Sequence, residues 1–473
     1  MLTKKTGSTK RMAIIASYFA GETYGLLGPQ LAATLIAEHT PYACIVAAVT
    51  RDDDKDLLKQ ALSDYFGTQR PVIGFSTLSG REDLFDFAQE MRDAGAVTLL
   101  AGPQADADFL GEVDRQNHPH RFRGLSKNFT FALHGPGEQA VFLLGNLDGT
   151  GWQSTPGLLY VGKDGDIIRN REKTWEEDFL KRVRWDNLYR IGKEGLVPLN
   201  VGTAQVLQHI GCPHAGREQW VDIDYPVCMP DRRGQKIRVF LRGCSFCDVA
   251  VDKGFHGALS LETVVSQIQS LPESADGRKI PFELINENPL PGLPRLLTTV
   301  ARRGIRLSQI NLIMRADWFL SGEKYLREAL GFAKHAGFRI LLSSVGFESF
   351  DNDILRNLNK GVNVETNLRA VRLMRRLKEE FPLQWRYARE EGAIHGFIHP
   401  TPWDTKESMA DVRKTLYLYA LPNDILPAHS TPLIIHHASG LGDWAREIER
   451  REGFRFNRYG SVIGWWRPEG KTG

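Results

Sequence analysis

Cysteine is scarce in this sequence, with five residues among 473. Because that number is odd and the cysteines are scattered, a disulfide framework of the secreted type is not expected. A reducing cytoplasm suits them better, and there closely spaced cysteines more often serve metal or redox chemistry. Long apolar runs are also absent, so no membrane span is expected. A short apolar run at 12–20 follows a basic start, and we expect a first buried strand there rather than a signal peptide.

An excess of charge of one sign is missing as well. The 60 basic and 57 acidic residues leave a net charge of +3, which gives no argument for a nucleic-acid or membrane-surface partner. The sequence shows no strong internal repeat and no low-complexity tract. Its 42% hydrophobic and 25% charged residues are ordinary for a globular protein, and its length predicts two to four domains.

Residues 12–145 alternate between apolar runs and amphipathic helical patterns. This order predicts an α/β fold with a doubly wound, Rossmann-like sheet. Turn residues follow several of the strands, and in such sheets ligands bind outside the carboxyl ends of the strands. The expected strands are 13–19, 43–49, 72–76 and 97–101, and the expected helices are 27–38, 54–66 and 83–94.

The next segment, 146–235, shows little pattern, and we expect an irregular connector with a short hairpin near 158–168. Alternation resumes in 236–435, where six strand–helix units predict a partial (β/α)6 barrel with its site at the carboxyl ends of the strands. Residues 436–473 are an aromatic-rich C-terminal extension, which we expect to pack back onto the barrel. The expected barrel strands are 237–241, 282–286, 309–315, 340–347, 393–398 and one near 425–428 or 432–435.

Two of the cysteines, Cys244 and Cys247, stand directly after the first expected barrel strand. Their spacing lets both sulfurs reach one metal centre, but an iron–sulfur or zinc site needs three or four ligands. Cys228 and Cys212 are the remaining candidates. Cys44 falls in an expected strand of the first domain, where a small buried apolar residue is the simplest interpretation.

Three kinds of site compete for the cysteine pair. A thioredoxin-type dithiol would need a helix N-terminus in a thioredoxin-like domain, which the surrounding pattern does not suggest. A structural zinc site would need a second tight pair, and only Cys212 and His214 in "GCPH" offer partial support for it. A cluster with three cysteines and one open iron fits best.

At these residues the sequence resembles a known family. "FLRGCSFC", preceded by a Rossmann-like domain, resembles the cobalamin-binding radical S-adenosylmethionine (SAM) enzymes. "SVGFESFDNDILRNLNKG" and "GFIHPTPWDTKESM" are similar to the fourth and fifth barrel strands of that family and the connections that follow them. "LLAGPQAD" and "HGPGEQAV" are similar to loops of its cobalamin domain. The resemblance covers about residues 12–435, with the motifs in the expected order.

The sequence departs from the family in the central motif. The family usually carries Cys-x3-Cys-x2-Cys in one loop, whereas here "RGC" runs directly into "SFC". The resemblance still implies a 4Fe–4S cluster held by three thiolates, so the third thiolate must come from elsewhere in the chain. Cys228 is the preferred third ligand beside Cys244 and Cys247, because it lies shortly before the first expected barrel strand. Cys212 is the alternative.

The resemblance also implies residues that bind SAM at the ends of the barrel strands. These are Phe246 at the adenine, Asn286 and Glu287 at the amino group, Arg315 at the carboxylate, and Glu348 and Ser349 at the ribose hydroxyls. His395 and His399 flank the end of the fifth strand, where a histidine near the substrate would act in proton transfer. Structural roles compete with each assignment: a packed aromatic, a salt bridge, a helix cap or a structural histidine.

For cobalamin, the resemblance points to loops after the strands of the first domain. The matching positions are Ser76, Thr77, Leu78, Gly102, Pro103, Gln104, Gly135 and Glu138. The domain has no Asp-x-His-x-x-Gly sequence, the pattern in which a histidine replaces the lower ligand of cobalamin. We therefore expect cobalamin bound without a histidine ligand, with Tyr24 or Leu27 nearby.

Together these observations favour a cobalamin-dependent radical SAM methyltransferase. It would add a methyl group to an unactivated carbon through a 5′-deoxyadenosyl radical and methylcobalamin. The alternatives are a cyclase or rearrangement enzyme with the same cofactors and a non-catalytic zinc- or cobalamin-binding regulatory protein. We expect a cytoplasmic protein with an unknown small-molecule or peptide substrate and an electron donor such as flavodoxin or ferredoxin.

Overall fold

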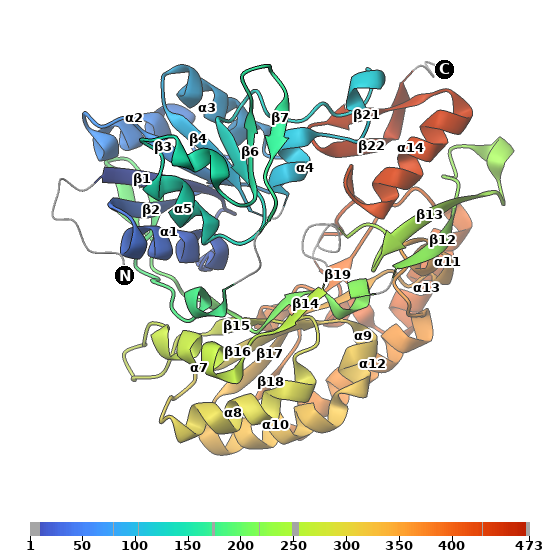
Figure 1. Ribbon diagram of the computed structural model, residues 1–473. Helices are drawn as coiled ribbons and strands as arrows, with labels where there is room; N and C mark the ends of the chain where they lie inside the picture. Colours follow the sequence, from blue (N-terminus) through green and yellow to red (C-terminus); the bar gives the residue numbers. More distant parts are fainter. Residues whose placement is uncertain are drawn as a thin grey trace. The chain divides into compact units, whose positions relative to one another are not determined.

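The computed structural model describes residues 10–78, 80–102, 104–172, 176–216, 218–247, 255–427 and 429–469. The chain divides into two compact units, whose elements are labelled in Figure 1. The first unit comprises Met1–Gln205 with Arg458–Val462, and the second comprises Val206–Asn457 with Ile463–Gly473. The division falls inside the segment that the sequence predicts as a connector.

The first unit is built on a nine-stranded sheet with the order β7-β6-β5-β4-β3-β1-β2-β8-β9. Its parallel centre consists of β1 (Lys10–Ser17), β2 (Tyr42–Val49), β3 (Val72–Ser76), β4 (Val97–Ala101) and β5 (Phe131–Leu133). The strand order reverses at β1, which lies between β3 and β2, so the carboxyl ends of these strands flank a switch point. The predicted doubly wound α/β sheet is confirmed.

Helices cover both faces of this sheet, which explains why its central strands are apolar along their whole length. One face packs against α2 (Lys55–Phe66), α3 (Glu82–Asp93) and α4 (Ala105–Leu110), and the other against α1 (Leu27–His39) and α5 (Gln139–Gly145) (Figure 1). The sequence also carries signals for where these helices begin. Asp54, for example, caps α2 by accepting hydrogen bonds from the backbone N–H groups of Asp56 and Leu57.

The segment 146–235 has more regular structure than the sequence indicates. The expected hairpin is present as β6 (Leu158–Val161) and β7 (Ile167–Arg169), which extend the sheet beyond β5. β8 (Leu188–Gly192) pairs in parallel with β2 and antiparallel with β9 (Gly195–Pro198). These strands are too short to show a clear alternation of apolar and polar residues, so the sequence pattern does not reveal them.

The second unit contains a sheet with the order β10-β15-β16-β17-β18, in which β19 also pairs with β17. Its strands are β10 (Ala204–Leu207), β15 (Phe282–Ile285), β16 (Gln309–Met314), β17 (Arg339–Glu348), β18 (Trp385–Arg386) and β19 (Gly396–Phe397). The connecting helices include α7 (Leu261–Ser270), α8 (Leu293–Arg302), α10 (Glu323–Ala336) and α12 (Val364–Glu380). The expected strands at 282–286, 309–315, 340–347 and 393–398 are thus all present.

The expectation that 237–241 forms the first barrel strand is wrong. This segment lies in β13 (Lys236–Arg242), which pairs antiparallel with β12 (Glu218–Asp224) in a separate two-stranded sheet. β13 alternates strictly between exposed and buried residues, as a ribbon with one solvent face does, whereas a central parallel strand is buried on both faces. The strand that pairs with β15 at that edge of the main sheet is β10, and it leads into β11 (His209–Gly211).

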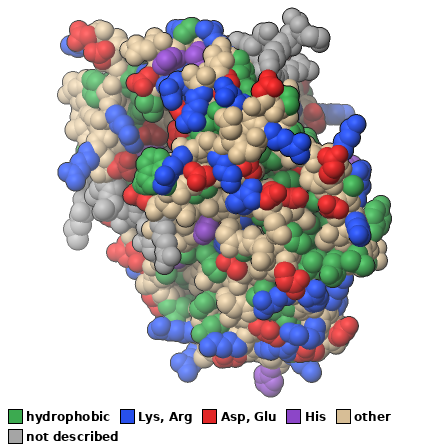
Figure 2. Space-filling view, turned by 90° about the vertical axis from the view of Figure 1, so that its right-hand side faces the viewer, with side chains coloured by type: hydrophobic (Ala, Val, Ile, Leu, Met, Phe, Trp, Pro, Cys, Tyr) green, Lys and Arg blue, Asp and Glu red, His purple; other side chains and the backbone are tan. Residues whose placement is uncertain are grey.

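The expected sixth strand also differs. The residues near 435 form β20 (Ile435–His436), which joins β21 (Arg455–Tyr459) and β22 (Val462–Glu469) in a three-stranded sheet. The inner face of the β12–β13 hairpin packs on α14 (Gly440–Glu452), so the C-terminal extension folds back as expected. On the face drawn in Figure 2, basic and acidic side chains are interspersed. None of the helices among the described residues is long and apolar enough to cross a membrane.

The hairpin depends on Trp444, which is fully buried in α14 and donates its indole N–H to the carbonyl of Asp224 at 3.1 Å. We expect Trp444→Ala to lower the free energy of unfolding by about 3–5 kcal/mol, because it leaves a large cavity. Trp220, on the solvent face of the same hairpin, is 60% exposed and serves as the control. Trp220→Ala should cost less than about 1 kcal/mol. Urea denaturation measures both, and equal losses would contradict the packing described.

Candidate functional site

Polar residues follow the strands of the second unit's main sheet at one edge. Asn286 and Glu287 follow β15, Arg315 follows β16, Glu348 ends β17 and His399 follows β19. Because these strands run in parallel, their carboxyl ends lie at the same edge. The structure therefore brings the predicted residues to one rim.

Residues 243–247, which we call the cysteine loop, directly follow the β12–β13 hairpin. The hairpin leads the chain outward along β12 and back along β13. The register pairs Glu218 with Arg242 at one end of the hairpin and Asp224 with Lys236 at the other. These ends are six residue steps apart, which is about 20 Å of strand. The segments before Glu218 and after Arg242 are consequently neighbours, although many residues separate them in the sequence.

Cys212 and Cys244 lie in those two neighbouring segments. Cys212 begins a turn in which Ala215 packs against Gly243, so closely that a Cβ on Gly243 would lie 3.4 Å from the Cα of Ala215. Burial raises the pKa of Cys212 and Glu287 raises it further, while hydrogen bonds with the backbone of His214 and Ala215 oppose the rise and Cys244 adds a smaller upward effect. The alternative third cysteine of the sequence analysis is therefore the one that the fold brings beside Cys244.

Cys228, the preferred third ligand, follows the opposite end of the hairpin. It is exposed, and its neighbour Val227 is held by a hydrogen bond to the carbonyl of Pro402. Within the described residues, no three His, Cys, Asp or Glu side chains form a ready metal-binding group. Cys44 is buried in β2, as the sequence indicates.

The cysteine pair is fixed by the loop that follows α11 (Asn352–Asn357). The N–H of Ser245 donates to the carbonyl of Leu358 at 2.9 Å, and the side chain of Asn359 donates to the carbonyl of Gly243 at 2.7 Å. Cys244 thus lies between two residues that are both bonded to this loop. We call residues 357–361 the clamp loop. Cys247 follows within the same turn, its N–H donating to the carbonyl of Cys244 at 3.2 Å.

Two cations face Cys244. Arg315 directs its Nη1 at the sulfur, 3.8 Å away, and Lys360 of the clamp loop lies close by. Burial raises the pKa of the Cys244 thiol, while Lys360 and Arg315 act in the opposite direction. Arg315 is also bonded to Asp317 and to the carbonyl of Lys360. Its guanidinium is therefore turned toward the cysteine loop, and binding of the SAM carboxylate by Arg315 stays a prediction.

Glu348 occupies an unusual turn at the end of β17. Its φ is +59°, and the N–H of Ser349 donates to the carbonyl of Phe347 at 2.7 Å across it. A non-glycine residue in such a turn costs roughly 1–3 kcal/mol, and strain of this kind concentrates at functional sites. Asn367 braces the turn by donating to the carbonyls of Phe347 and Ser349.

The turn directs the Glu348 carboxylate to Lys360, whose Nζ lies 2.9 Å from Oε1. Both side chains are nearly fully buried. Two glycines make room for the pair: a Cβ on Gly346 would lie 2.7 Å from the Lys360 Nζ, and one on Gly396 would lie 2.8 Å from the Glu348 Oε2. The pairing of Lys360 cannot be predicted from the sequence "LNKG", because nothing in these letters shows which acid the lysine contacts.

The two predicted histidines differ in what they offer to a substrate. His395 is buried, with Nδ1 accepting from the N–H of Val345 at 3.0 Å and Nε2 bonded to the carbonyl of Tyr387 at 2.9 Å. Both nitrogens are used, and burial lowers its pKa, so the structural role is favoured over proton transfer. His399 is bonded through Nδ1 to Asp404 at 2.9 Å, and its side chain is 35% exposed.

Other predicted SAM contacts are engaged within the protein. Phe246 is partly buried against the core cluster beneath the hairpin, which favours the packed-aromatic interpretation. Asn286 is bonded to Gln208 and to the N–H of Asn288, and Ser349 accepts from the N–H of Asp351. Burial raises the pKa of Glu287, and Lys360 and Arg315 oppose this shift. Of these residues, Glu287 is thus the one that adds to the charges around Cys244, together with Lys360, Arg315 and Glu348.

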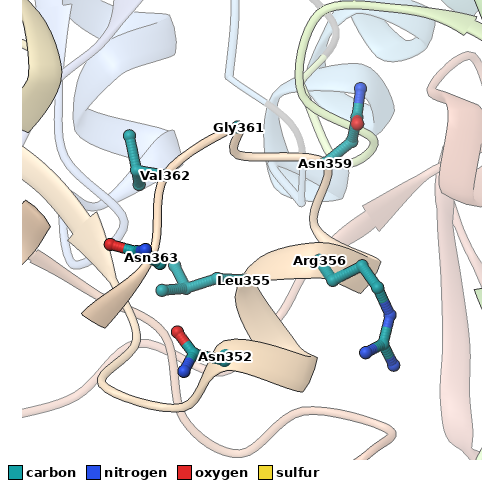
Figure 3. Close-up of a pocket in the computed structure, with 7 residues that line it drawn as sticks. All are labelled: Asn352, Leu355, Arg356, Asn359, Gly361, Val362 and Asn363. Atoms are coloured by element: carbon teal, nitrogen blue, oxygen red, sulfur yellow. The ribbon is translucent and has the colours of Figure 1, made fainter. Parts of the chain in front are cut away.

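A surface pocket of about 460 Å³ opens beside the clamp loop, between α11 and the start of α12 (Figure 3). Its polar side chains already have partners: Asn352 accepts from the N–H of Val364, and Asn363 from that of Thr366. The residues that line it are Asn352, Leu355, Arg356, Asn359, Gly361, Val362 and Asn363. None of the predicted site residues is among them, but Asn359 and Gly361 belong to the clamp loop, and a Cβ on Gly361 would lie 3.5 Å from Arg315 Nη2.

In the first unit, the predicted cobalamin positions follow β3, β4 and β5 at the carboxyl edge. The backbone N–H of Leu78 donates to Ser17 Oγ at 3.0 Å, which joins the ends of β3 and β1. Two apolar side chains are exposed there, Leu78 at 53% and Phe19 at 61%. The hydroxyl of Thr77 is buried without a hydrogen-bond partner among the described residues. An exposed apolar pair beside an unsatisfied hydroxyl fits a flat apolar ring with polar substituents.

The remaining positions of this edge vary in their surroundings. Gly102 has φ +100° and lies against Ser76, a conformation that favours glycine, and Gly135 has φ +90°. Glu138 is buried and accepts from the N–H of Glu176 at 3.1 Å. Gln104 precedes α4, Leu27 begins α1 and Tyr24 accepts from the hydroxyl of Tyr18. Pro103 lies outside the described residues.

No protein-family model and no curated protein matches this sequence. Two solved structures of the cobalamin-dependent S-adenosylmethionine radical enzyme OxsB are similar in fold. The one with aqua-cobalamin and S-adenosylmethionine bound gives a TM-score of 0.58 at 12% identity over 97% of this chain. The one with aqua-cobalamin bound gives 0.55 at 12% identity over 96%. This chain spans 64% of the length of the OxsB chain. It therefore has the fold that the motif resemblance predicts.

The space around the Glu348–Lys360 pair can be tested through Gly396. We expect Gly396→Ala to lower the free energy of unfolding by about 1–3 kcal/mol, because the new methyl group must displace a buried carboxylate. Gly331, in the middle of α10 with open space around it, is the control. Gly331→Ala should be neutral or stabilise by up to about 1 kcal/mol. A stabilising Gly396→Ala in thermal unfolding would contradict the described packing.

Proposed function

We propose that this protein is a cobalamin-dependent radical SAM enzyme, and that it methylates an unactivated carbon. The observation that carries the proposal is that the turn after Cys212 packs against Gly243, next to Cys244. Cys212 would then supply the third thiol that the sequence motif lacks. The fold shared with OxsB and the first unit's apolar carboxyl edge support the same proposal.

In the second unit, Cys212, Cys244 and Cys247 would hold a 4Fe–4S cluster. Cysteine thiolates are the usual ligands of such clusters, and three of them would leave one of the four irons open. The clamp loop holds the loop backbone on both sides of Cys244, and Arg315 donates toward its sulfur. When bound, the cluster supplies the electron that cleaves SAM, and cobalamin carries the methyl group. The protein positions both cofactors and limits the access of water.

In the first unit, Phe19 and Leu78 would lie against the apolar face of cobalamin, and the unpartnered hydroxyl of Thr77 would meet one of its amide substituents. Loops at the carboxyl edge of a doubly wound sheet are the usual location for such a ligand. No residue of this unit is assigned as a lower ligand, in agreement with the missing Asp-x-His-x-x-Gly sequence. An electron donor such as flavodoxin or ferredoxin, and a small-molecule or peptide substrate, complete the proposal.

Anaerobic purification followed by incubation with SAM and a reductant tests this function. We expect about four irons per chain, cobalamin absorbance and cleavage of SAM. S-adenosylhomocysteine together with 5′-deoxyadenosine would indicate methylation, whereas 5′-deoxyadenosine alone would indicate a cyclase or rearrangement enzyme. The control is the double variant Cys244→Ala/Cys247→Ala, which should bind no iron and cleave no SAM. Zinc without iron in the unmodified protein would refute the proposal in favour of a regulatory protein.

A further inference from the structure

The first turn of α14 carries two glycines, Gly440 and Gly442, to which the proposed function assigns no role. Glycine is the least favourable residue in a helix after proline, so a pair of them needs a reason. A Cβ on Gly442 would lie 2.4 Å from the carbonyl oxygen of His437. A Cβ on Gly440 would lie 3.0 Å from Leu241 and 3.3 Å from the carbonyl oxygen of Ser245. The start of α14 therefore lies directly against the cysteine loop.

Ser245 is the residue at which the cysteine loop is held. It lies between the two cysteines of the loop and is fully buried. Its N–H donates to the carbonyl of Leu358 at 2.9 Å, and its hydroxyl donates to the carbonyl of Asn357 at 2.8 Å. Its own carbonyl accepts from the backbone N–H of Leu441 in α14 at 2.8 Å. The clamp loop and α14 thus hold the same buried residue through separate hydrogen bonds.

The start of α14 is itself fixed. Its N-cap, Ser439, is fully buried, accepts from the N–H of Gly442 and donates to the carbonyl of His436 at 2.8 Å. One turn further on, Trp444 packs into the core beneath the β12–β13 hairpin. The first N–H groups of a helix have no partner within the helix, and the cysteine loop supplies one for Leu441. The helix cannot shift here without moving the loop.

We propose that the first turn of α14 positions the cysteine pair for metal binding, with Gly440 and the N–H of Leu441 as the positioning groups. This inference rests on the proposed function. Because Ser245 is one residue from Cys244 and two from Cys247, a shift of its backbone changes the direction of both thiols. Groups that orient metal ligands without touching the metal affect its affinity strongly. The C-terminal extension, through α14, is then part of the cysteine site.

Iron release to a chelator, measured after anaerobic reconstitution with iron and sulfide, tests this role. Gly440→Ala should release iron about tenfold faster than the unmodified protein, because the new methyl group pushes α14 away from the carbonyl of Ser245. The control is Gly331→Ala, which adds the same group to α10, where nothing lies within 4 Å, and should leave the rate unchanged. An unchanged rate in Gly440→Ala would overturn the inference, whatever the variant does to thermal unfolding of the iron-free protein.

A second measurement needs no variant, and it decides the question if Gly440→Ala does not fold. If α14 holds the cysteine loop, metal bound to that loop must in turn hold α14. Amide hydrogens of residues 440–446 should exchange about tenfold more slowly in the iron-loaded protein than in the iron-free protein, and those of α10 should change less. An equal change in both helices would overturn this inference alone. An unmodified protein that binds no iron would overturn it together with the proposed function.

Discussion

An iron–sulfur cluster requires cysteines from segments that lie close together, and in this chain the antiparallel register of β12 and β13 brings the segments that carry Cys212 and Cys244 side by side. The hairpin leads the chain away from Cys212 and returns it to Cys244, so that the turn after Cys212 packs on Gly243. Buried side chains on the inner face of β13 fix the hairpin against α14. A one-residue slip of the register would exchange the two faces of a strand and misplace the cysteine loop.

The same loop brings together the charges of the site. The clamp loop carries Lys360 to Glu348 and holds the backbone on both sides of Cys244, while Arg315 reaches the sulfur from the end of β16. Positive charges beside a thiolate stabilise it. One small region thus links the local strain at Glu348 to the chemistry proposed for the cysteines.

Much of this arrangement can be predicted from the sequence, and the rest depends on contacts between distant segments. The mainly apolar runs at 43–49 and 340–347 can be recognised because strands buried on both faces are largely apolar. β18, with two residues, is too short to leave a pattern, and β13 was assigned to the wrong sheet although its alternation indicates a half-exposed ribbon.

The site, too, is predictable from the sequence only in part. The polar residues after the parallel strands are predictable, since all carboxyl ends share one edge. Closeness along the sequence favours Cys228 as the third cysteine, whereas the antiparallel hairpin brings the segment that carries Cys212 beside that of Cys244, although the two are far apart in the chain. The partner of Lys360 could not be predicted either, because it depends on a strained turn and on two glycines of neighbouring strands.

The iron content of two single-cysteine variants, reconstituted anaerobically side by side, tests the central claim most directly. Cys228→Ala should retain the full iron content of the unmodified protein, because Cys228 follows the far end of the hairpin. Cys212→Ala should lose most of its iron, because it removes the thiol that the hairpin brings to Cys244. Full iron in Cys212→Ala together with loss of iron in Cys228→Ala would contradict the account.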